Sequence, residues 1–165
     1  MILQLRLDER LIHGQVVTAW SRALNADTLM VANDEVIKDQ LKVKMLLMTA
    51  PAGKKVHVRG VDESIRLLKD PRADKMRILL IVDNPADAIR LVEALPIHEV
   101  NVANYRKKKS RDKTVIHAYC SADPEDFELF KKLNSISESI FCQMLPSVPK
   151  ENFSELLVKA KPENK

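Results

Sequence analysis

The residues best suited to chemistry lie in one short run near the start of the chain, DERLIHGQV, residues 8–16. An imidazole such as that of His13 is a good nucleophile near neutral pH, because much of it is uncharged there. Arg10 carries a planar, permanently charged fork that suits phosphate oxygens. An acid such as Asp8 would hold the imidazole ring in one tautomer. The run therefore predicts a nucleophile placed inside an anion site.

The backbone after His13 favours the same interpretation. Gly14 lets the chain turn sharply and approach a bound group closely. A helix that begins near Gly14 or Gln15 would direct its free N–H groups and the positive end of its dipole at this loop. An isolated histidine beside a helix start is also compatible with a structural or merely exposed position. The residues by themselves leave both interpretations open.

Strand-like and helix-like segments alternate around this run. Along residues 2–8 the leucines occupy one face, so Arg6 and Asp8 share the other face and are expected near the same loop. Ile37, Leu41 and Met48 belong to a stretch whose apolar residues recur every three or four positions, which predicts a helix. Further strands are expected over residues 28–32, 55–59, 77–82, 99–103 and 114–120 and within 135–145.

This alternation predicts an α/β fold, a single three-layer domain with a mostly parallel, seven-stranded mixed sheet and helices on both faces. The domain is expected to cover residues 1–160, and residues 161–165 are expected to form a frayed tail. Ligands of such sheets bind beyond the carboxyl ends of the strands. The loop that carries His13 is at one of these ends.

Composition excludes several other classes of protein. No apolar run approaches the roughly 20 residues needed to span a bilayer, and the first residues lack a signal-peptide pattern, so a cytoplasmic protein is expected. Cys120 and Cys142 form no Cys-x-x-Cys pair and are predicted to be buried free thiols, and no metal site is expected. The net charge of +4 includes a basic run, RKKKSRDK, at 106–113. That run predicts either a solvated loop or a surface that docks an acidic partner.

The first segment also carries a resemblance. RLDERLIHGQVVTAW, residues 6–20, resembles the opening of the enzyme IIB subunits of the mannose/fructose/sorbose class of bacterial phosphotransferase systems. In that family the pattern is Arg-x-Asp-x-Arg-Leu-Ile-His-Gly-Gln-Val followed by a tryptophan, and this sequence matches it at every position. The segments VANDEV, LLMTAPAGKKVHV, EVNVAN and CQMLPSVP extend the resemblance along nearly the whole chain.

The resemblance implies a phosphoryl relay that needs no cofactor. A phosphorylated IIA subunit would pass the group to His13, and the chain would pass it to a sugar imported through the membrane subunits IIC and IID. Arg10 would neutralise the phosphoryl charge, with Asp8 and Gln15 also taken over from the family motif. The expected partners are therefore IIA, the IIC/IID permease, the sugar and a second copy in a homodimer. The chain would be cytoplasmic and held peripherally at the permease.

The expected substrate-binding residues are Arg6, Gly14, Gln15 and Asn104. Asn104 marks a departure, because the Gly-Gly pair of the family is Ala103-Asn104 here, and the family's Asp is Val148. The family carries the phosphoryl group on Nδ1, but this sequence alone does not select between the ring nitrogens. A non-catalytic regulatory or binding protein with the IIB fold is the main alternative. A nucleic-acid binder is disfavoured, because aromatic residues make up only 4% of the chain.

Overall fold

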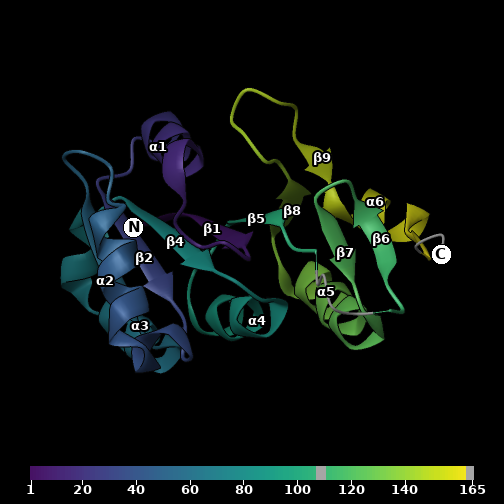
Figure 1. Cartoon of the computed structure of the whole chain (residues 1–165), viewed down its shortest axis with the longest axis horizontal. Coiled ribbons are helices and arrows are strands. Elements are labelled where there is room, and N and C mark those ends of the chain that lie inside the picture. The colour runs from purple at the N-terminus through teal and green to yellow at the C-terminus, as the bar shows by residue number, and fades with distance from the viewer. Residues whose placement is uncertain (107–110, 163–165) are drawn as a thin grey trace.

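The computed structural model describes residues 1–106 and 111–162 (Figure 1). Its strands are β1 Ile2–Asp8, β2 Thr28–Ala32, β3 Lys55–Arg59, β4 Ile78–Val82, β5 Glu99–Asn104, β6 Thr114–His117, β7 Cys120–Ala122, β8 Ser139–Cys142, β9 Glu151–Asn152 and β10 Lys161–Pro162. The helices are α1 Gly14–Ala23, α2 Gln40–Met48, α3 Val61–Leu68, α4 Pro85–Ala94, α5 Pro124–Ile136 and α6 Phe153–Lys159, with short 3-10 helices η1 Val36–Lys38 and η2 Pro71–Lys75.

Seven strands form the main sheet in the order β3-β2-β4-β1-β5-β8-β9. Every pairing in it is parallel except that of β8 with β9. β1 lies between β4 and β5, where Leu5 is in register with Leu80 on one side and Val100 on the other. The predicted α/β class and mixed seven-stranded sheet are therefore confirmed. The carboxyl end of β1 opens near the middle of the sheet edge, which is where ligands of such sheets bind.

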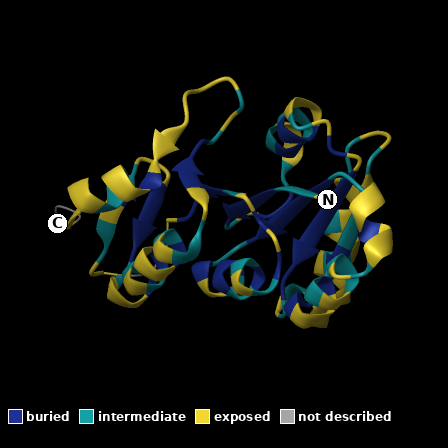
Figure 2. Ribbon diagram, turned by 180° about the vertical axis from the view of Figure 1, so that it is seen from behind, coloured by how far each residue is buried: buried dark blue, intermediate teal, exposed yellow. Residues whose placement is uncertain are grey.

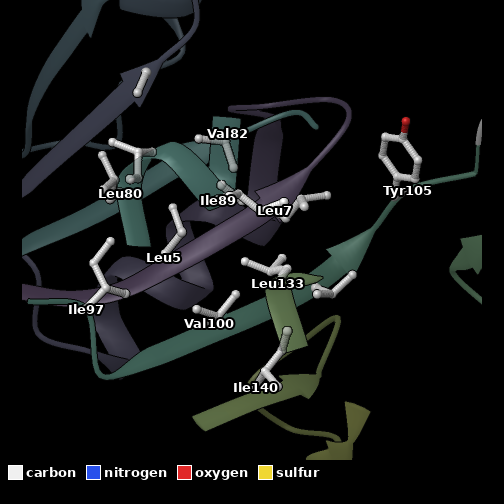
Figure 3. Packing of buried hydrophobic residues seen from close by; sticks show 14 of the residues in the cluster. Leu5, Leu7, Leu80, Val82, Ile89, Ile97, Val100, Tyr105, Leu133 and Ile140 are labelled. Carbon is white, nitrogen blue, oxygen red and sulfur yellow. The ribbon is translucent and has the colours of Figure 1, made fainter. Parts of the chain in front are cut away.

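Helices cover both faces of the sheet. On one face Val17 and Trp20 of α1 pack with buried residues of β2 and β4, and Val43 of α2 packs at the margin of the same cluster. On the other face the side chains of β1, β4 and β5 pack against α4 and α5, as Figure 3 shows for Leu7 beside Ile89. Because side chains alternate along a strand, Leu5 and Leu7 point to the second face. Arg6 and Asp8 then point to the face that α1 covers.

The last strands differ from the prediction. Residues 114–120 were expected to form one strand of the main sheet, but the chain turns between His117 and Cys120. The two halves are β6 and β7, which pair antiparallel and form a second sheet with β10. The two-residue connection makes a tight hairpin, and the strand-like residues on both sides of it gave no sign of a turn in the sequence. The seventh strand of the main sheet is instead the short β9.

The tail also differs from the prediction. Lys161 pairs with Val115, and Pro162 pairs with Thr114, so these two tail residues form a strand instead of fraying. Residues 163–165 lie outside the described part of the chain. The second sheet lies at the opposite end of the molecule from α2 (Figure 1).

The structure also bears on the predicted cysteines and on the basic run. Cys120 and Cys142 are buried free thiols, as predicted. The basic run at 106–113 lies partly outside the described residues, because 107–110 are not described, and its proposed docking role stays a prediction. Arg106 is exposed, but Asn104 and Tyr105 just before it are buried in and beside β5. In the described residues no helix is long and apolar enough to cross a membrane.

Candidate active site

The candidate site lies where β1 ends and α1 begins. The connection between them is five residues long, and its last residue, His13, is the N-cap of α1 with an extended backbone (φ −146°). The His13 side chain accepts no hydrogen bond from the N–H groups in the first turn of α1, so it does not block them. A free helix start attracts anions through these donors and the helix dipole. The imidazole is therefore held at an anion-binding position.

Asp8 connects the parts of the site. Its carboxylate is fully buried, and Oδ2 accepts a hydrogen bond from Nη2 of Arg6 at 2.9 Å. Oδ1 accepts from the backbone N–H of Arg10 at 3.1 Å and from Nδ2 of Asn104 at 3.3 Å. The Arg10 guanidinium lies beside the same carboxylate, with Nε 3.7 Å from Oδ1. One buried carboxylate thus binds both the loop that carries His13 and the end of β5.

The ring of His13 is oriented by two neighbours. Nε2 is buried and faces Oδ2 of Asp8 across 3.8 Å. Nδ1 lies 3.4 Å from the carbonyl oxygen of Leu11. The side chain is 22% exposed, and Nε2 contributes nothing to that exposed surface. An incoming group therefore meets the ring from a side other than Nε2.

The environment keeps His13 neutral over a wider pH range than a free imidazole. Burial lowers the pKa of His13 below its ordinary value, and the charges of Arg10 and Arg6 lower it further. The negative charge of Asp8 acts in the opposite direction. A neutral imidazole retains the lone pair that a nucleophile needs.

Arg6 and Arg10 occupy different environments. The Arg6 side chain is fully buried, and Nη1 and Nη2 each lie 3.4 Å from the carbonyl oxygen of Met144. Arg6 was expected to contact substrate, but its lack of exposed surface makes it a support for Asp8. The Arg10 side chain is 49% exposed, so its guanidinium is available to a ligand.

The remaining predicted residues divide in the same way. Gly14 and Gln15 are exposed at the start of α1. Gly14 has φ +42°, a conformation that disfavours side chains, although a Cβ there would meet nothing within 4 Å. Asn104 is buried and reaches Asp8, so it supports the carboxylate and is not open to a ligand.

Two residues of the site had not been singled out from the sequence. Leu11 is buried with φ +57°, a left-handed conformation that is strained for a branched side chain. Trp20 donates a hydrogen bond from Nε1 to the carbonyl oxygen of Met144 at 2.8 Å, and the Arg6 guanidinium lies over its ring. From the sequence, Trp20 is only the tryptophan that ends the family motif. Together Trp20 and Arg6 fix the segment after β8 against the site.

The sequence matches the family model described as the PTS system sorbose subfamily IIB component over residues 2–165. The chain belongs to this family. It is 40% identical over 162 residues to a probable phosphotransferase enzyme IIB component of Streptococcus pyogenes serotype M6, covering 95% of this chain and 99% of the relative. It is 36% identical over 155 residues to the mannose-specific EIIAB component of Escherichia coli K12, covering 93% of this chain and 47% of the relative, so it spans about half of that longer protein.

Solved structures of the family agree with the fold. The crystal structure of the IIBSor domain of the sorbose permease from Klebsiella pneumoniae superposes with a TM-score of 0.88 at 27% identity, and the match covers 96% of this chain and 97% of that domain. The mixed, mostly parallel sheet with helices on both faces is therefore the fold of this IIB family. The chain is a IIB component of a sugar phosphotransferase system.

Proposed function

We propose that His13 is the residue that carries the phosphoryl group between two partners. In the first step the nitrogen–phosphorus bond on a phosphorylated IIA histidine breaks as a bond to a His13 ring nitrogen forms. In the second step that bond breaks as the phosphorus bonds to a sugar hydroxyl oxygen, and the hydroxyl proton leaves to solvent. The sugar would be held by a IIC/IID permease, with the chain bound peripherally at its cytoplasmic side.

One observation carries the proposal, the placement of a partly exposed, neutral imidazole at the free start of α1 beside the Arg10 guanidinium. The helix start and the exposed guanidinium would stabilise the phosphoryl oxygens. Nε2 of His13 has no exposed surface, so we expect the phosphoryl group to bond to Nδ1. This requires the tautomer with its proton on Nε2 and release of the 3.4 Å contact between Nδ1 and the Leu11 carbonyl oxygen. Arg6 and Asn104 would act by holding Asp8.

The test is phosphorylation of the purified chain by phosphoenolpyruvate, the first enzyme of the relay, the general phosphocarrier and a IIA subunit of this family. An acid-labile, base-stable phosphate is expected, and peptide mapping should locate it on His13. His98 provides the matched control, because it is an exposed histidine far from the site, paired with Glu138. His13→Ala should abolish labelling and His98→Ala should preserve it. Undiminished labelling of His13→Ala would overturn the proposal.

A further inference from the structure

A group of large apolar side chains projects outward from η1 and α2. These side chains, which we call the α2 face, are Ile37, Leu41, Met45 and Met48. Leu41 is 67% exposed, Met45 59% and Met48 85%. In Figure 2 most of α2 is drawn as exposed, and no residue of the helix is buried. The spacing of Ile37, Leu41 and Met48 predicted one helix. The structure has α2 over Gln40–Met48 and places Ile37 in the separate η1, and all three side chains are exposed.

The opposite side of α2 explains this arrangement. Val43 and Leu46 are partly buried, and they hold the helix on the sheet face that α1 also covers. A nine-residue helix needs only one such row to pack. The second apolar row therefore adds nothing to the core, and an exposed cluster of this kind marks an interaction surface.

The charged side chains of α2 itself are both positive, and the nearest acid in sequence is Asp39, the N-cap of the helix. Lys42 and Lys44 are exposed on α2, and the segment from Gln40 to Met48 contains no acidic residue. Within the described residues neither lysine forms an ion pair with an acid, whereas Lys38 pairs with Glu35. The face thus combines leucine and methionine side chains with two free ammonium groups.

We propose that the α2 face binds the surface of an anionic lipid bilayer. Apolar side chains of a surface helix enter the boundary between headgroups and acyl chains, and flanking lysines bind the anionic headgroups. Lysine suits this position because its flexible stem lies along apolar groups while its ammonium group reaches outward. The fluid leaflet also requires no groove of matching shape.

The composition of the face favours lipid over a protein partner. Cores of protein interfaces are enriched in aromatic residues, methionine and arginine and depleted in lysine. Met45 and Met48 therefore suit either kind of partner, and the other residues of the face decide. The α2 face has no aromatic side chain and no arginine among η1 and α2, and it has Lys42 and Lys44. A symmetric contact between two copies would also bring the lysines of one α2 toward those of the other, with no acid on the helix to compensate.

This binding goes beyond phosphoryl transfer, because the α2 face shares no residue with the site around His13. The two are also measured separately. Labelling of His13 by soluble donors needs no bilayer, and vesicle binding needs no phosphoryl donor. Failure of one experiment therefore leaves the other unaffected.

The test is flotation of the chain with vesicles of phosphatidylglycerol and phosphatidylcholine, and with vesicles of phosphatidylcholine alone. The triple variant Leu41→Gln/Met45→Gln/Met48→Gln removes the apolar row with residues that favour helix. Val158→Gln is the matched control, because Val158 is 87% exposed on α6 at the other end of the molecule (Figure 1). The unaltered chain and Val158→Gln should float with the anionic vesicles. The affinity of the triple variant for these vesicles should be at least about tenfold lower.

The lysines provide a second variant. Lys42→Gln/Lys44→Gln should weaken binding to anionic vesicles and reduce its dependence on salt. If circular dichroism shows that the triple variant is unfolded, the single variant Met48→Gln replaces it in the flotation experiment. Met48 is the most exposed residue of the α2 face, so this change should not affect folding. Weaker flotation of that variant would support the proposal.

Several results would overturn the proposal. These are no flotation of the unaltered chain with anionic vesicles, equal flotation with neutral vesicles, and equal binding by the triple variant. Flotation only with vesicles that contain the permease would assign the face to a protein partner. A concentration-dependent dimer that the triple variant abolishes, without any vesicle binding, would assign the face to a second copy.

Discussion

The buried carboxylate of Asp8 faces Nε2 of His13 across 3.8 Å, and the same carboxylate forms a 2.9 Å ion pair with the fully buried Arg6. The position of the imidazole is therefore coupled to a charge pair beneath α1. The Asn104 side chain and the Arg10 backbone complete the contacts of this carboxylate. Because these four contacts come from β1, its loop and β5, the main sheet itself orients the ring.

Replacing Asp8 by Asn should destabilise the fold and change the titration of His13. Arg6 would remain buried without its charge partner, which costs about 3–5 kcal/mol of unfolding free energy. The pKa of His13 should fall further, because Asp8 is the charge that raises it. Denaturant unfolding and an NMR titration of the ring measure the two effects. Glu35→Gln, at an exposed ion pair, is the control, and an Asp8→Asn chain as stable as that control would contradict the prediction.

Replacing Arg10 by Lys should slow phosphoryl transfer and leave stability unchanged. Lysine keeps the charge but loses the planar fork, and removing one preorganised group that stabilises charge costs about 3 kcal/mol, or about a hundredfold in rate. Rapid-quench transfer from a phosphorylated IIA subunit measures the rate. Arg22→Lys, at an exposed arginine in the last turn of α1, is the matched control. A rate for Arg10→Lys within about twofold of the unaltered chain would show that Arg10 does not bind the transferring group.

Stability should rise with pH through the range just below 6.5, the ordinary pKa of histidine. The folded pKa values of His13 and His57 are both lowered, chiefly by burial. Between each lowered pKa and 6.5 the unfolded chain binds more protons than the folded chain, so the free energy of unfolding increases with pH there and levels off above it.

The contribution of each histidine to this slope can be separated. Denaturant unfolding at a series of pH values should show a smaller slope for His13→Gln than for the unaltered chain. His57→Gln should remove the contribution of His57, whose pKa is also lowered by Arg59 and Lys55. An unchanged slope in both variants would contradict the lowered pKa values of these two partly buried rings.

Replacing Trp20 by Phe should weaken the support beneath the site. The variant loses the 2.8 Å hydrogen bond from Nε1 to the Met144 carbonyl oxygen and leaves a gap beside the Arg6 guanidinium. The expected loss is about 1–3 kcal/mol of unfolding free energy. Transfer should slow less than in Arg10→Lys, because Trp20 touches no reacting atom. Equal unfolding free energies for the variant and the unaltered chain would show that the bond contributes nothing to stability.

Local pattern was sufficient for the main elements. Alternating apolar residues and helical spacings predict the strands and helices that lead to His13, because both periodicities follow from backbone geometry alone. The position of His13 at the end of β1 and the start of α1 followed from the same reasoning. The pairings of β9 with β8 and of β10 with β6 could not be predicted in this way. Strands of two residues carry no periodicity, and they depend on partners that are distant in the sequence.

The site shows the same division. The sequence alone determined which residues stand near the nucleophile, because Arg6, Asp8 and Arg10 are fixed to the end of one strand. Only the tertiary structure decided that Arg6 and Asn104 are buried supports and that Arg10 is open, since burial depends on α1 and β5 packing over them. Tertiary packing likewise decided which apolar row of α2 faces the sheet. Spacing identifies a helix, but the neighbouring sheet surface selects the side that it covers.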